Sequence, residues 1–466
     1  MNYKSLKICF AVFCLLPILH GCAKSRHSSY FLDSVNSGEG YYLSNSPSYS
    51  SDSMLLILSF SGGGTRAASL AYGVLQVLEK TMVTIDGKQK SLLDEVDVIT
   101  SVSGGSYTAA YYGLFGKQIF KDYESEFLKR NFQSDLYRLI YSPWNWPALG
   151  SSNFDRSDLI ADYLNSTLFR DSTIDDMRRT DTPFIMINAS ETGFATQIAF
   201  EQRQFDMFCL DVSKMPVGVA VMASSAVPLI FTPITFKNLS DQCDNKLPRW
   251  ARRALEEGDK SSRQYYLAGK YKNFKDVNNY PYIHLYDGGL TDNLGLRSII
   301  NVVERQGGVW NALKIMDHED VRKAVVIVVD AKSSSAIDSS RDKQIKFNDA
   351  LNSALNVSIN SLSFETISMM REIMSGWQTE ITQSRCWEYA RQNRDQADCY
   401  VIDPYLIEVS FEQLKSAQKA NQLIRIPTSF NLHDSQVDLI KESAARILED
   451  SSQFQKLLRD LNSAAL

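Results

Sequence analysis

Positive charge is scarce relative to negative charge in this sequence, and that scarcity excludes several classes of partner. Across 466 residues, 49 Lys and Arg stand against 54 Asp and Glu, a formal net charge of −5 at pH 7. A chain without a basic surplus cannot neutralise a run of phosphates, which argues against a nucleic-acid partner. The same balance argues against purely electrostatic adhesion to anionic lipid. With 44% hydrophobic residues the chain is globular rather than disordered, and its length allows one to three domains.

Metal-ligand and nucleotide motifs are also missing. No Cys-x-x-Cys pair occurs among the seven cysteines and no loop is rich in carboxylates, so neither zinc nor calcium is expected. The glycine-rich stretches have neither the lysine of a Walker loop nor the Gly-x-Gly-x-x-Gly spacing of dinucleotide sites. We therefore expect no metal and no cofactor.

The amino terminus has the pattern of an export signal. Lys4 and Lys7 precede an apolar run, residues 8–19. About 12 apolar residues are too few to span a bilayer, but they suit the core of a secretory signal peptide. The run ends in Leu19-His20-Gly21-Cys22, which resembles the lipobox of bacterial lipoproteins.

That resemblance implies that residues 1–21 are removed and that Cys22 is lipidated. An ordinary cleavable signal with an incidental cysteine is the alternative. Several acyl chains on one residue hold a protein stably on a membrane. Because Ala23 rather than Asp follows the cysteine, we expect a lipid-anchored protein of the bacterial cell envelope, at the outer membrane and facing the periplasm.

Four cysteines remain after the signal peptide and Cys22 are set aside. An even number in an oxidising compartment favours disulfides, and four cysteines allow three pairings. We favour the two pairs that close the shorter loops, Cys209–Cys243 and Cys386–Cys399.

From Met54 onward the sequence alternates apolar runs of strand length with helical stretches. Residues 22–53 before it are polar and lack periodicity, which predicts a flexible tether. The alternation predicts an α/β domain over residues 54–335 with a mainly parallel sheet covered on both faces. The predicted strands are residues 54–60, 96–102, 183–190, 282–287 and 324–331.

Three further segments have a distinct composition. Residues 237–281 are polar and charged, and we interpret them as an insertion and a candidate lid. Residues 336–466 are predicted to form a helical region packed on the main domain, with a long amphipathic helix over residues 351–381. A third segment is rich in aromatic residues: Phe132, Tyr137, Tyr141, Trp144, Trp146 and Phe154. These could form a patch at a membrane interface, but we favour ordinary packing inside the protein.

A serine between small residues follows the second predicted strand, in Ser101-Val102-Ser103-Gly104-Gly105. A tight turn from strand to helix exposes the Oγ of such a serine above the sheet. The amino end of the following helix favours negative charge developing beside Ser103. On its own, this pattern is also typical of an ordinary turn.

Two more motifs follow predicted strands. Gly62, Gly63 and Gly64 precede Arg66, and their N–H groups can converge on an oxyanion, although a structural turn or a phosphate would also suit them. Asp287 is followed by two glycines, which suits either a base for a serine or a simple turn. Because strand ends meet at one edge of a doubly wound sheet, we expect all three motifs to lie together.

Together the motifs resemble the patatin-like phospholipase family over residues 54–300. That family carries an Asp-Gly-Gly-Gly-x-Arg loop, a Gly-x-Ser-x-Gly turn and an Asp-Gly-Gly/Ala motif in this order. The chain departs from this pattern at Ser61 and Ser101, neither of which supplies the nucleophile or a backbone donor. A fourth stretch, residues 223–228, resembles the family's segment between the serine and the aspartate.

The resemblance implies a three-layer sandwich and a Ser103–Asp287 dyad without histidine. It also implies an oxyanion loop at Gly62–Gly64, and an Arg66 that orients this loop or meets a head-group phosphate. The substrate would be a phospholipid or lysophospholipid, hydrolysed by a membrane-anchored enzyme.

Three alternatives stay open at this point. The order Ser103, Asp287, His433 would also satisfy an α/β-hydrolase triad, although His433 fits better as the cap of a helix beginning near Asp434. The acyl-enzyme could pass its acyl group to an acceptor other than water, as an acyltransferase does. The protein could also be a non-catalytic envelope lipoprotein with a hydrolase-like fold.

Overall fold

The computed structural model of the chain describes most residues after the amino terminus. The predicted signal peptide and Cys22 lie outside the described residues. Within the described part, no helix is both long and apolar enough to cross a bilayer. The described ranges are 30–35, 38–46, 50–151, 154–243, 246–333, 347–392 and 399–463.

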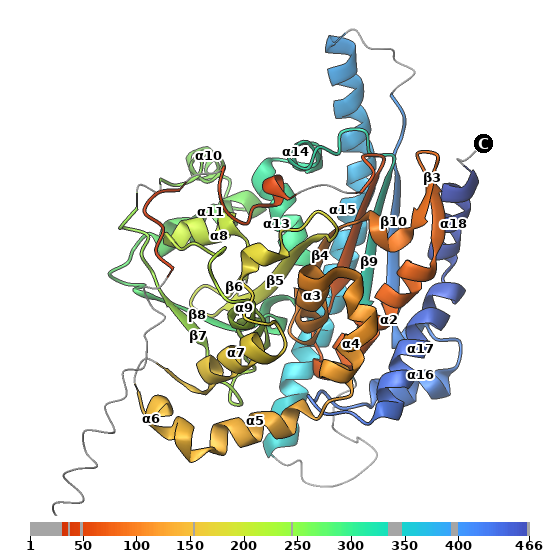
Figure 1. Cartoon of the computed structure of the whole chain (residues 1–466). Helices are drawn as coiled ribbons and strands as arrows, with labels where there is room; N and C mark the ends of the chain where they lie inside the picture. Colours follow the sequence, from red (N-terminus) through yellow and green to blue (C-terminus); the bar gives the residue numbers. More distant parts are fainter. Residues whose placement is uncertain are drawn as a thin grey trace, which may run out of the picture.

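An eight-stranded sheet forms the centre of the molecule, in the order β10-β9-β1-β4-β5-β8-β7, with β6 paired to β5 (Figure 1). The strands from β10 to β5 run parallel, and β8 and β7 extend the sheet in antiparallel fashion. The bounds are β1 Met54–Phe60, β4 Val96–Val102, β5 Phe184–Glu191, β6 Thr196–Ala199, β7 Ile234–Lys237, β8 Tyr282–Asp287, β9 Lys323–Asp330 and β10 Asp403–Ser410.

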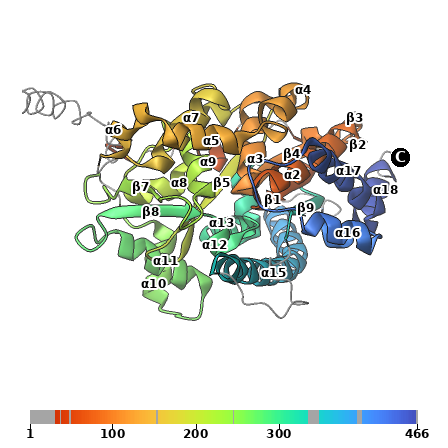
Figure 2. The same cartoon turned by 90° about the horizontal axis from the view of Figure 1, so that it is seen from below.

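Helices cover both faces of this sheet, which makes three layers. Figure 2, seen from below, shows the sheet between the two groups of helices. One face carries α2 Gly64–Lys80, α3 Gly104–Phe115, α7 Arg156–Thr167, α9 Val217–Ser225 and α17 Asp434–Asp450; the other carries α11 Arg263–Phe274, α12 Gly289–Asp292, α13 Leu296–Gln306, α14 Val309–Ile315 and α15 Phe347–Arg391.

Burial on both faces explains why the central strands are apolar without alternation. Every residue of β1 and β5 is buried, so each side chain on either face replaces water with packed protein. The α/β fold with a mainly parallel sheet, predicted from these runs, is confirmed.

The strand that carries Asp287, β8, runs opposite to the five parallel strands from β10 to β5. β8 pairs antiparallel with β5, and only over Ala189–Glu191. That stretch lies beyond Asn188, where the pairing of β5 with β4 ends. Because β5 overshoots β4, the antiparallel β8 still ends beside the carboxyl end of β4. The burial of β8 alternates along the strand, as expected for a strand with one face uncovered.

The carboxyl-terminal region contains more than the predicted helices. β10 pairs with β9 in parallel and forms one edge of the central sheet, so the boundary predicted at residue 335 divides a single sheet. Helix α15 has 45 residues and continues through Gly376. The other helices of this region are α16 Ala417–Ile424, α17 and α18 Ser452–Ser463.

Part of the predicted tether is fixed to the body instead. The Tyr41 side chain is buried, stacks on Phe184 with ring centroids 4.5 Å apart, and donates a hydrogen bond to the Ile185 carbonyl. Burying an aromatic ring of this size outweighs the entropy of a flexible segment. The tether prediction is therefore wrong for residues 38–46.

The predicted insertion forms two helices, α10 Arg249–Glu257 and α11. The Lys270 ammonium donates to the Ala195 carbonyl, and Gln264 donates to the Glu304 carbonyl at the end of α13. Among the described residues, no hydrogen bond or ion pair joins α10 or α11 to Ser103 or Asp287. The lid role of this segment stays a prediction.

Candidate active site

Ser103 lies on a strained turn between β4 and α3. Its backbone has φ 47° and ψ −121°, a conformation that costs a non-glycine residue about 1–3 kcal/mol. The turn can form only beside glycines, since a Cβ at Gly104 would lie 2.2 Å from the Gly64 carbonyl oxygen. The strain lifts the Ser103 side chain out of the strand direction, toward Asp287.

Ser103 and Asp287 are neighbours, and both side chains are almost entirely buried. Ser103 is 7% and Asp287 8% exposed. The Gly289 N–H donates to Asp287 Oδ1 at 2.8 Å. Burial raises the pKa of Asp287 to about 6, and the hydrogen bonds from Gly289 and Ser103 lower it only in part. The structure therefore places a hydroxyl against a carboxylate that is more basic than an exposed aspartate.

A second serine, Ser224, holds the turn in place. Its Oγ accepts a hydrogen bond from the Ser103 N–H at 2.8 Å and donates to the Asn188 carbonyl at 2.6 Å. The Gly288 N–H in turn donates to the Ser224 carbonyl. Ser224 therefore ties β4, β5 and the end of β8 together. The sequence marked residues 223–228 as a family segment but indicated no role for this hydroxyl.

The glycine loop and the turn meet with their backbones in contact. No described residue accepts a hydrogen bond from the N–H groups of Gly63, Gly64 or Gly104. The Gly62 N–H, which we predicted as an oxyanion donor, instead donates to the Asn293 carbonyl at 3.0 Å. The N–H groups of Gly63 and Gly64, and that of Gly104 after Ser103, are thus the ones in this loop and turn without an acceptor among the described residues. Gly62 serves by its small size, since a Cβ there would lie 3.2 Å from that of Ser103.

Arg66 is buried and holds the glycine loop against neighbouring segments of the chain. Its guanidinium donates to the carbonyls of Ala331 and Ile426 and to Thr428 Oγ1. Burial lowers its pKa to about 10, while the nearby Asp330 carboxyl opposes the shift. With 2% of its surface exposed, Arg66 orients the loop and is not placed to meet a head group.

The other sequence-predicted residues lie elsewhere. His433 is exposed just before α17, and its N–H donates to Gln436 Oε1, a capping arrangement away from Asp287. Disulfides join Cys209 to Cys243 and Cys386 to Cys399, with Cα atoms 5.9 and 5.1 Å apart. Within the described residues, no cluster of His, Cys, Asp and Glu could hold a metal ion.

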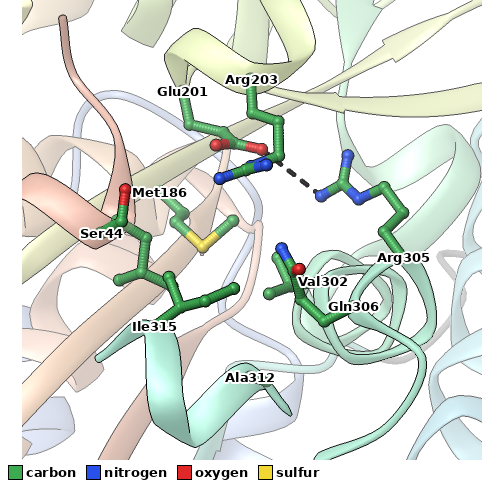
Figure 3. Close-up of a pocket in the computed structure, with 10 residues that line it drawn as sticks. Ser44, Met186, Glu201, Arg203, Val302, Arg305, Gln306, Ala312 and Ile315 are labelled. Atoms are coloured by element: carbon green, nitrogen blue, oxygen red, sulfur yellow. Dashed lines mark hydrogen bonds and ion pairs between the residues drawn. The ribbon is translucent and has the colours of Figure 1, made fainter. Parts of the chain in front are cut away.

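A small cavity near the fixed tether segment is not a substrate site. Figure 3 shows the Arg305–Glu201 ion pair at its wall, with Met186, Ser44 and Ile315 around it. Its volume is about 20 Å³, room for roughly one water molecule. Neither Ser103 nor Asp287 lines it.

Comparisons with known proteins match the sequence to a protein family. A family model described as Patatin-like phospholipase matches residues 58–300, just over half of the chain. Among solved structures, human GIVD cytosolic phospholipase A2 is similar with a TM-score of 0.47 and 14% identity, over 89% of this chain and 63% of that one. Its complex with methyl gamma-linolenyl fluorophosphonate has a TM-score of 0.39 and 12% identity, over 89% and 60%. No curated protein matches the sequence.

Proposed function

Because the chain belongs to the patatin-like phospholipase family, we propose that it is a serine lipid acyl hydrolase of the phospholipase A or lysophospholipase type. The observation that carries the proposal is the buried Ser103–Asp287 pair. The N–H groups of Gly63, Gly64 and Gly104 lie near this pair and have no acceptor among the described residues, which supports the same interpretation. The substrate is an ester of a phospholipid or lysophospholipid.

In the proposed reaction, Ser103 Oγ attacks the ester carbonyl carbon while Asp287 accepts the hydroxyl proton. The carbonyl oxygen becomes an oxyanion and takes hydrogen bonds from the Gly63, Gly64 and Gly104 N–H groups. Each such donor can contribute roughly 10²–10³ in rate. Asp287 then gives its proton to the leaving alcohol, and the acyl group stays on Ser103 as an ester.

Water then hydrolyses the acyl-enzyme by the same kind of step. Asp287 accepts a proton from water as the water oxygen attacks the acyl carbon, and the same N–H groups bind the second oxyanion. The Ser103 oxygen leaves and recovers its proton from Asp287, which releases a fatty acid. None of these steps assigns a role to a metal, and hydrolysis is expected to be unchanged by a chelator.

A fluorophosphonate probe tests the nucleophile, since it phosphonylates an activated serine. We expect labelling of the wild type and of His433→Ala, and no labelling of Ser103→Ala. An unlabelled wild type would favour the non-catalytic lipoprotein, and loss of labelling in His433→Ala would replace the dyad with a triad. Mass spectrometry of lipid products then separates release of fatty acid from transfer to another acceptor.

We also propose that Cys22 carries the lipid anchor and holds the enzyme on the cell envelope, at the outer membrane. The lipobox-like sequence before Cys22 supports this. Metabolic labelling with palmitate should mark the wild type but not Cys22→Ser. Labelling that survives in Cys22→Ser would contradict the anchor without bearing on Ser103.

A further inference from the structure

Large apolar side chains are exposed beside the edge of the sheet that holds Ser103. Helix α5 Phe132–Tyr141, α6 Trp146–Leu149 and the turn between them expose four aromatic residues, of which Trp144 is 90% exposed. The loop after α9 exposes two aliphatic residues. We call these six residues the apolar rim: Tyr137, Tyr141, Trp144, Trp146, Leu229 and Ile230.

Both halves of the apolar rim are linked to the active site through a few intervening residues. The Asp287 N–H donates to the Ala226 carbonyl at 3.0 Å, three residues before Leu229. On the other side, Phe132 of α5 packs on Phe430, and Phe430 packs on Tyr107 of α3, one helical turn after Ser103. Figure 1 shows α5 and α6 across the end of the molecule where the parallel strands finish.

The composition of the rim fits one kind of partner. Exposed apolar clusters mark interaction sites, because isolated proteins rarely leave them in water. Tyrosine and tryptophan are the residues that favour the boundary between water and lipid, where the ring is buried and its polar group stays hydrated. The net charge of −5 offers little electrostatic attraction to anionic lipid, so adhesion would depend on apolar insertion.

The number of residues between Cys22 and Tyr30 limits how far the body can lie from a bilayer that holds the proposed anchor. Tyr30 is already held by the body, because its carbonyl accepts from the Asp211 N–H at 2.7 Å and its ring packs on Phe236 of β7. Eight residues from Cys22 to Tyr30 span at most about 28 Å. Strand β7 begins at Ile234, four residues after Ile230, so the chain joins the body near one half of the rim.

We propose that the apolar rim inserts into the surface of a phospholipid bilayer, so that the acyl substrate reaches Ser103 from the membrane and not from water. The proposal rests on the proposed lipid hydrolase function and on the anchor at Cys22. The 7% exposure of Ser103 fits a site entered from one side by a lipid already docked at the rim.

Quenching of tryptophan fluorescence by lipids with brominated acyl chains tests the insertion directly. The full chain is reconstituted in phosphatidylcholine vesicles, and Trp144→Phe/Trp146→Phe is compared with Trp387→Phe. Trp387 is 64% exposed near the far end of α15 and is the matched control. We expect quenching to fall by more than about half in the double variant and to stay unchanged in Trp387→Phe. Equal quenching in all three proteins would overturn the proposal.

Activity on two substrates separates this proposal from the function on which it rests. In Trp144→Ala/Trp146→Ala, hydrolysis of vesicle phosphatidylcholine should fall about tenfold or more, while hydrolysis of a soluble short-chain ester stays within twofold. A wild type that hydrolyses neither substrate would refute the hydrolase function. The quenching experiment would still show whether the apolar rim inserts into the bilayer. A dimer that the alanine variant converts to monomer would instead assign the rim to a second copy of the chain and overturn the membrane proposal.

Discussion

Asp287 combines burial with the ability to accept a proton. Its pKa of about 6 arises because burial disfavours the charged form more than the hydrogen bonds from Gly289 and Ser103 favour it. At neutral pH most of the carboxylate is ionised, yet it is a stronger base than an exposed aspartate with a pKa near 4. A base with a pKa closer to the working pH transfers protons more effectively.

This pKa predicts an acid limb in the rate profile. Since only the carboxylate accepts the Ser103 proton, kcat/KM on a soluble ester should rise about tenfold per pH unit below pH 6 and level off above it. The Asp287→Asn variant should lose at least about 10³-fold in activity, and its residual rate should lack the limb. A limb centred near pH 4 in the wild type would contradict the buried base.

At the same scale, the sequence indicated that Ser103 and Asp287 lie at strand ends, but it did not indicate the contacts of their neighbours. Both residues could be predicted because a motif and the end of an apolar strand are patterns within a short stretch of sequence. Gly62 could not be told from Gly63, since the acceptor of its N–H, the Asn293 carbonyl, is 231 residues away. Ser224 gave no signal for the same reason, because a buried hydroxyl is distinguished only by its partners.

Arg66 joins the start of α2 to two segments that are far away in the sequence. It lies on α2, yet its guanidinium bonds the carbonyl after β9 and the segment before α17. The same segment accepts the Thr65 N–H at the Ser429 carbonyl, 2.9 Å away. The carboxyl-terminal region thereby fixes the loop that carries Gly63 and Gly64.

Replacing Arg66 with lysine should loosen that loop. A lysine keeps the charge but cannot reach three acceptors with a planar fork, so buried carbonyls lose their donors at about 1–3 kcal/mol each. We expect a lower unfolding temperature and at least about a tenfold loss in kcat on a soluble ester. Thr428→Val, which removes a single acceptor, is the milder control. Unchanged kcat in Arg66→Lys would show that the loop keeps its shape without the guanidinium.

Element directions were harder to predict than element positions. The apolar runs of β1, β4, β5 and β9 predicted parallel strands because burial on both faces leaves a continuous pattern. β8 has a similar composition, but its antiparallel direction depends on how far β5 extends past β4. β10 escaped prediction because, as an edge strand, it is only partly buried and lies in a sequence dominated by helices.

On the scale of the whole molecule, a buried ion pair joins the start of β4 to the segment before β9, at the end of the sheet away from Ser103. His318 Nε2 and Asp97 Oδ1 are 3.0 Å apart, and both side chains are nearly inaccessible. Burial lowers the pKa of His318, but the hydrogen bond and charge of Asp97, with further contributions from Met316 and Asp52, outweigh it and raise this pKa to about 9. The folded protein therefore holds a proton that the unfolded chain releases near pH 6.5.

Stability should consequently decline in alkaline solution. A raised histidine pKa contributes stability that is complete below pH 6.5 and is lost as the pH rises through 9, up to about 3 kcal/mol. Urea unfolding between pH 6 and 9.5 measures the slope. His318→Gln, which can bond Asp97 without titrating, should flatten it. An equal slope in both proteins would assign the decline to other groups.

The attachment of Arg66 also has a consequence for the order in which the protein matures. Arg66 and Ile426 are 360 residues apart, so a chain made from its amino terminus contains Ser103 long before the segment that braces the glycine loop. Contacts of such long range form late in folding. Under the mechanism proposed above, the glycine loop beside Ser103 is complete only when nearly the entire chain has folded, so ester hydrolysis requires the carboxyl-terminal segment to be in place.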